Sequence, residues 1–155
     1  EILIPNECPK INVDIGEIEL QIGKILTTLD CNDHEISILF IGDQGIRDLN
    51  HQFRGIDRPT DVLSFPQISD DEPEPPGAPV LGDVAISLET ARQQSEDHGL
   101  SLKEELTLLL IHGILHLLGY DHEISAQEEE RMRKKTRELF EVIYPGKKLA
   151  DTCNF

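Results

Sequence analysis

The strongest constraint on the fold is an apolar run at residues 106–118 that carries two histidines four residues apart. Ser101 begins a capping box, the pattern in which a serine and a glutamate three residues later close the start of a helix. Gly119 stands where many helices end in a left-handed residue. The run is too short to cross a bilayer. We therefore predict a helix between Ser101 and Gly119 that carries His112 and His116.

The spacing of these histidines predicts a metal site. Residues four apart on a helix lie on one face, so His112 and His116 can converge on a single cation. A turn at Gly119 can then bring His122 back to the same point. Three imidazoles leave one tetrahedral position open, as in catalytic zinc sites where water is the fourth ligand. We expect one zinc ion per chain bound by His112, His116 and His122, although nickel or iron would also suit imidazole ligands.

Two features limit this interpretation. The alternative is that the histidines lie in the core and are satisfied by backbone carbonyls, which is costly for two imidazoles on an apolar helix. In addition, the motif matches only the latter half of the metzincin pattern H-E-x-x-H-x-x-G-x-x-H. Gly113 stands where that pattern has the glutamate that acts as general base. The missing glutamate weakens the case for a peptidase but does not eliminate it, because zinc-bound water could act alone or with another base.

The remaining hydrophobic pattern predicts an α+β fold, with a small mixed β-sheet surrounded by helices and a zinc-metalloprotease-like three-histidine site. We expect residues 1–155 to form a single domain. The acidic, proline-rich residues 69–79 are expected to form a mobile surface loop. The predicted elements are a broken strand at 2–13, strands at 35–42, 61–66 and 81–88, and helices at 15–29, from Asp43 as N-cap to 53, from 89 to 97, and from the Ser125 capping box to 143.

The chain has a formal net charge of −16, which argues against avid nonspecific binding to nucleic acid. Residues 131–148 are the exception, with seven lysines and arginines against two glutamates. This segment is either a solvated helix face with ion pairs to residues 127–130 or a phosphate-binding surface. The three cysteines form no C-x-x-C motif, so a reducing cytoplasm is the simplest location.

Three segments of the chain form a recognisable set: HGILHLLGYDH at residues 112–122, LNHQFRGIDRPTDVLSFP at 49–66 and LGDVAIS at 81–87. Together they resemble the YbeY family of bacterial rRNA maturation factors. Their order and spacing are similar to those of the family over roughly residues 35–144. The two longer motifs are highly specific in combination.

The resemblance implies a zinc-dependent, single-strand-specific endoribonuclease. Its expected role is processing of rRNA, including 3′-end maturation of small-subunit rRNA, and ribosome biogenesis and quality control. The implied partners are single-stranded RNA and ribosomal or ribosome-associated proteins, with no membrane or DNA partner. The resemblance also implies that His112, His116 and His122 bind zinc and that Arg54 faces the metal across the cleft.

Arg54 suits a phosphodiester substrate, because a guanidinium can bind two phosphate oxygens and stabilise developing negative charge. The alternative is a structural ion pair with Asp57 or Asp61. Asp61 and Ser64 are expected to serve the fold rather than the site. The attacking nucleophile, water or the ribose 2′-OH, stays open at this point. So do two other functions: a metal-dependent peptidase, and a noncatalytic ribosome-associated factor that contains zinc.

Overall fold

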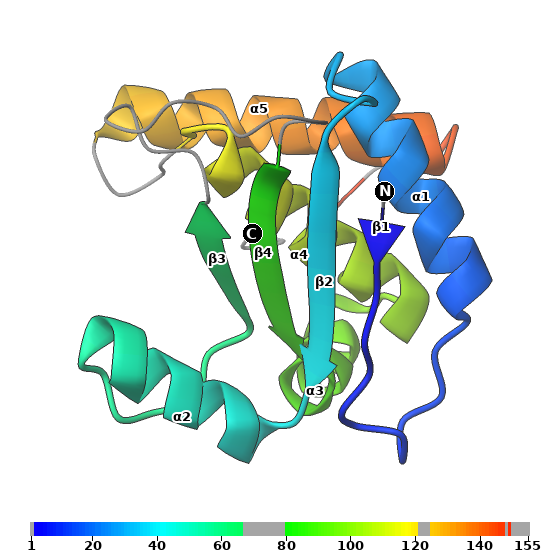
Figure 1. Ribbon diagram of the computed structural model, residues 1–155. Helices are drawn as coiled ribbons and strands as arrows, with labels where there is room; N and C mark the ends of the chain where they lie inside the picture. Colours follow the sequence, from blue (N-terminus) through cyan, green and yellow to red (C-terminus); the bar gives the residue numbers. More distant parts are fainter. Residues whose placement is uncertain (1, 67–79, 121–124, 148, 150–155) are drawn as a thin grey trace.

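The computed structural model describes residues 2–66, 80–120, 125–147 and 149. Within these residues the chain forms a small sheet and a set of helices arranged around it (Figure 1). The elements in chain order are β1 (Ile2–Leu3), α1 (Ile15–Thr28), β2 (Glu35–Ile41), α2 (Asp43–Arg54), β3 (Val62–Pro66), β4 (Val80–Ser87), α3 (Leu88–His98), α4 (Leu102–Leu117) and α5 (Ala126–Ile143).

The sheet is mixed, as the sequence predicts. Its strand order is β1-β2-β4-β3, and β1, β2 and β4 run parallel. β3 pairs antiparallel with β4, with Ser64 opposite Val84, so β3 is an edge strand. The predicted loop at residues 69–79, which joins these two strands, lies outside the described residues.

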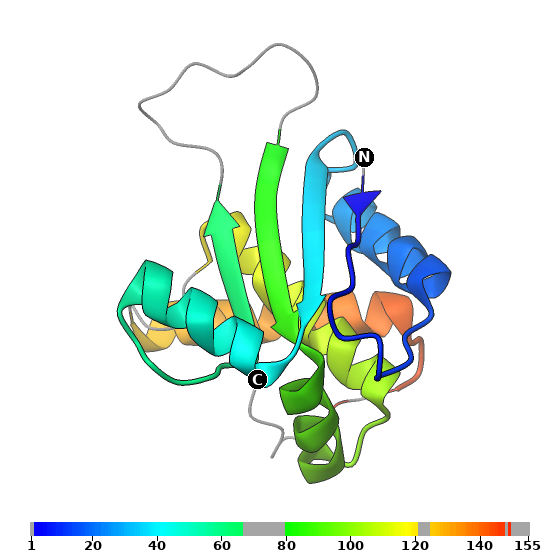
Figure 2. The same ribbon diagram turned by 60° about the horizontal axis from the view of Figure 1, so that its bottom comes forward.

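Alternating residues divide the sheet into two covered faces. In β2, Ile36 and Ile38 belong to the main core, whereas Leu39 and Ile41 belong to a smaller cluster with residues of α2. Side chains of α1, α4 and α5 complete the main core. In Figure 2, α2 lies in front of the sheet and α4 and α5 lie behind it. The helices α2 and α4 therefore cover opposite faces of the sheet.

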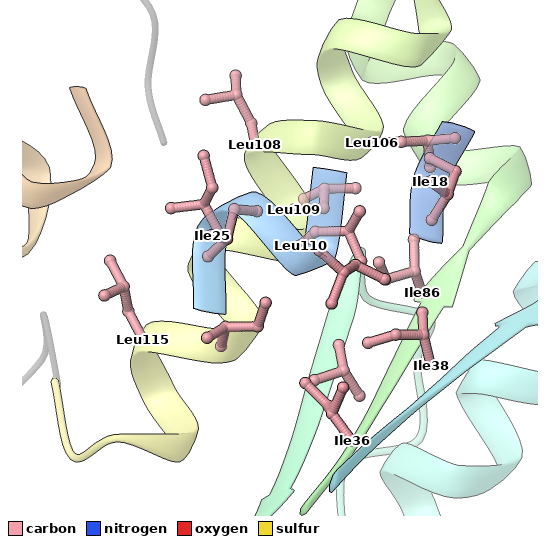
Figure 3. Packing of buried hydrophobic residues seen from close by; sticks show 14 of the residues in the cluster. Ile18, Ile25, Ile36, Ile38, Ile86, Leu106, Leu108, Leu109, Leu110 and Leu115 are labelled. Carbon is pink, nitrogen blue, oxygen red and sulfur yellow. The ribbon is translucent and has the colours of Figure 1, made fainter. Parts of the chain in front are cut away.

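α4 is the central helix of the main core. Its capping box is formed as expected: the Ser101 hydroxyl accepts from Glu104 N at 3.1 Å, and the Glu104 carboxylate accepts from Ser101 N at 2.9 Å. Leucines of α4 pack against isoleucines of α1 and the sheet (Figure 3), and Leu106 and Leu110 are almost fully buried. This burial fixes the orientation of the helix that carries the histidines. No helix in the described part of the chain has the length and apolar character needed to cross a membrane.

The helices begin close to the predicted residues, but the predicted capping side chain is not always the one that caps the helix. Asp43 is wrong as an N-cap, because Gly42 occupies that position without a side-chain cap. The Asp43 carboxylate instead accepts from Ser87 Oγ at 2.6 Å and from Thr90 Oγ1 at 2.5 Å. Parallel β2 and β4 end at the same edge of the sheet, and this places hydroxyl donors beside Asp43. At the start of α5, Ser125 accepts from Glu128 N at 3.2 Å, which is half of the predicted capping box.

Candidate functional site

His112 and His116 lie on the accessible edge of α4. Both side chains are partly exposed, while the intervening Gly113 and Leu115 are buried. The two Nε2 atoms are 3.0 Å apart, and the ring planes meet at 64°. The histidines are therefore not enclosed in the core, and their ring nitrogens point toward one place.

This geometry fits a bound cation. Two nitrogens that each lie 2.0–2.1 Å from a tetrahedral zinc ion are about 3.3 Å apart, close to the observed separation. A neutral pair of imidazoles could also share one proton at this distance. Both side chains are partly exposed, which a site that takes further ligands requires.

The chain leaves α4 through the predicted turn. Gly119 has a φ of 95°, and Tyr120 N donates to Leu115 O at 3.0 Å. Arg131 of α5 lies over the Tyr120 ring, 4.2 Å from its centroid, and this cation–π contact ties the turn to α5. His122 lies outside the described residues, so its part in the site stays a prediction. Within residues that are described, no three potential metal ligands come together.

Gly113 has a packing role that the sequence did not indicate. A Cβ atom at this position would lie 2.7 Å from Val84 Cγ1 and 3.4 Å from Ser64 Oγ. The Ser64 hydroxyl also donates to Gly113 O at 3.0 Å. A side chain at residue 113 would thus be directed at β3 and β4 and would crowd Val84, so this position does not suit a glutamate general base.

Arg54 is the last residue of α2 and is exposed. The proposed structural partners are engaged elsewhere: Asp57 pairs with Arg47 at 2.8 Å, and Asp61 accepts from Val62 N at 2.8 Å. Among the described residues Arg54 has no ion pair or side-chain hydrogen bond. Its guanidinium is therefore available to a ligand, although α2 covers the sheet face opposite α4.

Ser64 and Asp61 serve the fold, as expected. Ser64 connects β3 to α4 through the hydrogen bond to Gly113 O. Asp61 orders the start of β3 and accepts from Gln94 of α3 at 3.3 Å. These contacts position the elements that carry the histidines and Arg54.

Phe53, the residue before Arg54, is an exposed aromatic side chain that the sequence patterns did not single out. Phe53 is 59% exposed, and its ring lies edge-on to Phe65 of β3 with centroids 5.2 Å apart. The available signal was a phenylalanine at the end of a helix that is otherwise largely polar.

The basic residues 131–148 include most of α5, and several of their side chains form ion pairs with glutamates. Arg131 pairs with Glu128 at 3.1 Å, and Arg133 approaches Glu129 at 3.9 Å. Both glutamates belong to the acidic stretch that the sequence suggested as partner. Such exposed pairs contribute little to stability. An open hollow lies beside the helix, lined by Glu130, Arg133, Lys134 and Arg137.

Comparison with known proteins identifies the family. The family model "Endoribonuclease YbeY" matches residues 3–144. A protein of that name from Persephonella marina is 46% identical over 142 residues, covering 92% of each chain. Another from Syntrophus aciditrophicus is 39% identical over 92% of this chain and 89% of its own length.

The fold has a solved counterpart. The solution structure of TM1509 from Thermotoga maritima is similar with a TM-score of 0.65 and 26% identity, over 96% of this chain and all of that one. The matched region includes α4, with its histidine pair, and Arg54. The chain therefore belongs to the endoribonuclease YbeY family.

Proposed function

We propose that this protein is a metal-dependent endoribonuclease that cuts single-stranded RNA and takes part in rRNA processing. The observation that carries the proposal is the convergence of the His112 and His116 Nε2 atoms at the accessible edge of α4. Relatives that share most of the chain are named as endoribonucleases, which supports the reaction class.

His112, His116 and His122 would hold the metal, which we propose to be zinc. When bound, zinc supplies a water of pKa about 7 or polarises a phosphoryl oxygen. The protein's own contribution is to aim two imidazoles from a buried helix and to bind the substrate phosphate. The attacking group, water or the ribose 2′-OH, is left open by this arrangement.

Arg54 would bind the phosphodiester. Its guanidinium pairs with no carboxylate in the described part of the chain, and such a group can donate two hydrogen bonds to phosphate oxygens and stabilise the charge that develops on them. The packing at Gly113 argues against the peptidase alternative, since a side chain at this position would be directed at Val84 and the sheet, and the glutamate that peptide hydrolysis uses is absent. The structural-zinc alternative is disfavoured because structural sites usually have four protein ligands.

The acidic character of the chain suggests how RNA reaches the site. A net charge of −16 weakens encounter with free RNA, so we propose delivery by a ribosomal or ribosome-associated protein in the cytoplasm. Maturation of the 3′ end of small-subunit rRNA and ribosome quality control would follow from that setting. Rapid cleavage of naked RNA at high salt would show that no such delivery is needed.

Metal analysis tests the ligand assignment. Protein purified without added metal should contain about one zinc ion per chain. His116→Ala should lose it, and the matched control His34→Ala, in the loop before β2, should keep it. Full zinc in the His116→Ala protein would overturn the assignment.

Cleavage assays test the reaction class. Arg54→Glu should abolish cutting of single-stranded rRNA fragments, whereas Arg92→Glu, an equal charge change on α3, should preserve it. Cutting that resists both Arg54→Glu and chelators would come from a contaminant. Hydrolysis of unstructured peptides, without RNA cleavage, would favour the peptidase alternative.

A further inference from the structure

Phe53 is an exposed aromatic side chain that lies against Phe65, a residue that packs on the smaller core cluster. Phe65 is half-buried against α2, but Phe53 projects from the last turn of that helix and is 59% exposed. Exposing a phenylalanine to water gives up the stabilisation that its burial would provide. The edge-on contact at 5.2 Å holds the Phe53 ring in a defined orientation.

The charges around this ring favour an anionic ligand. Arg54 and Arg58 are exposed and have no carboxylate partner within the described chain. The nearby carboxylate of Asp57 is occupied by Arg47, whose hydrogen bond and charge hold the pKa of Asp57 below its usual value. Arg54 is the residue after Phe53, and Asn50, one turn before Phe53 in α2, donates to Arg58 O at 2.9 Å. Both arginines therefore belong to the same end of α2 as the exposed ring, on a chain with net charge −16.

Strand β3 connects the aromatic pair to α4, the helix that carries the histidines. Phe65 and Ser64 are consecutive in β3, so their Cα atoms are about 3.8 Å apart and their side chains point to opposite faces. Phe65 faces α2, while Ser64 bonds to Gly113 O, beside His112. Since β3 is the edge of the sheet, a ligand that passes over this edge can contact both sides.

We infer that Phe53, supported by Phe65, stacks on a nucleobase of single-stranded RNA while Arg54 and Arg58 contact the adjoining phosphates. This inference rests on the proposed function and names a substrate-binding subsite for it. Unpaired bases are recognised by stacking on aromatic side chains, and arginines track the backbone. A single exposed ring at the end of a helix that also carries arginines suits one base better than a protein partner, whose interface needs a larger apolar area.

Binding of a short unstructured RNA containing 2-aminopurine tests the subsite, with an abasic RNA of equal length as reference. Binding should quench the 2-aminopurine fluorescence by stacking. Phe53→Ala and Phe53→Leu should weaken binding of the base-containing RNA roughly 5- to 100-fold and relieve the quenching. Affinity for the abasic RNA should stay unchanged. Phe53→Trp should keep both the affinity for the base-containing RNA and the quenching. Leu20→Ala, at an exposed leucine of α1, should change neither of these two measurements.

The outcomes separate the subsite from the proposed function. If wild type binds and cuts RNA and Phe53→Ala does so equally well, the stacking inference is wrong and the proposed function stands. Equal weakening for base-containing and abasic RNA would also overturn it, since that indicates loss of fold or charge rather than stacking. If wild type neither binds nor cuts RNA in the presence of zinc, the proposed function fails and the subsite fails with it.

Discussion

Replacing Gly113 by alanine tests the close approach of α4 to the sheet. The added Cβ would lie 2.7 Å from Val84 Cγ1 and 3.2 Å from Cγ2, well inside van der Waals contact. Overpacking of this kind typically costs about 1–3 kcal/mol, and the helix propensity of alanine over glycine returns about 1 kcal/mol. We expect Gly113→Ala to lower the free energy of unfolding by up to about 2 kcal/mol.

The cause can be isolated with a second substitution. Val84→Ala removes the two methyl groups that collide, at a cost of about 2 kcal/mol for lost burial. In that background Gly113→Ala should become stabilising by about 1 kcal/mol, because only the propensity gain remains. The two substitutions should therefore show a favourable coupling of about 1–3 kcal/mol.

Urea unfolding followed by far-ultraviolet circular dichroism, with a chelator present, measures all four proteins without a contribution from metal. Gly23→Ala in α1 is the matched control, since a Cβ there meets nothing within 4 Å and should stabilise the protein by about 1 kcal/mol. Additivity of the two substitutions within about 0.5 kcal/mol, or a Gly113→Ala protein as stable as Gly23→Ala, would refute the steric explanation.

Three further predictions concern helix ends and a buried charge. Gly119→Ala should cost about 1–2 kcal/mol, because the φ of 95° is unfavourable for alanine while the space around it is open; an unchanged urea midpoint would contradict this. Ser101→Ala should cost about 1 kcal/mol through the lost cap of α4, measured in the same way. Burial raises the pKa of Glu105, which also contacts His98 at 3.0 Å. Because the folded state holds this proton more tightly, stability should fall as pH rises from about 4.3 to the raised pKa. Glu105→Gln should flatten that decline, and parallel profiles for the two proteins would argue against it.

Much of the fold could be predicted because local signals and burial agree. The apolar stripe of α1 and the Ser101 cap of α4 each specify one element, and the structure contains both. Asp43 shows where such reasoning ends. Its sequence context favours an N-cap, but Ser87 and Thr90, more than forty residues away, provide stronger donors. Only the parallel pairing of β2 with β4 brings those hydroxyls close.

The site was predicted in part for a similar reason. The i, i+4 spacing of His112 and His116 is a local signal, and it predicts the approach of the two rings that the structure shows; the metal itself stays a prediction. Gly113 was interpreted as the absence of a base, because its contact with Val84 depends on how two distant elements pack. Phe53 lies within the segment 49–66, but nothing in that segment marks it as exposed, and its exposure beside Phe65 becomes visible only when α2 lies on the sheet.

The position of the edge strand β3, between the helix that carries Arg54 and the helix that carries the histidines, restricts which RNA can contact both. Arg54 and Phe53 belong to the helix on one face of the sheet, and the histidine pair belongs to the helix on the other. If both groups act on one RNA molecule, its backbone has to bend around β3. A single strand with unstacked bases can follow such a path, whereas a base-paired helix can neither bend so sharply nor offer a free base to Phe53. Selectivity for single strands would then follow from the position of β3 between the two helices, without sequence-specific contacts.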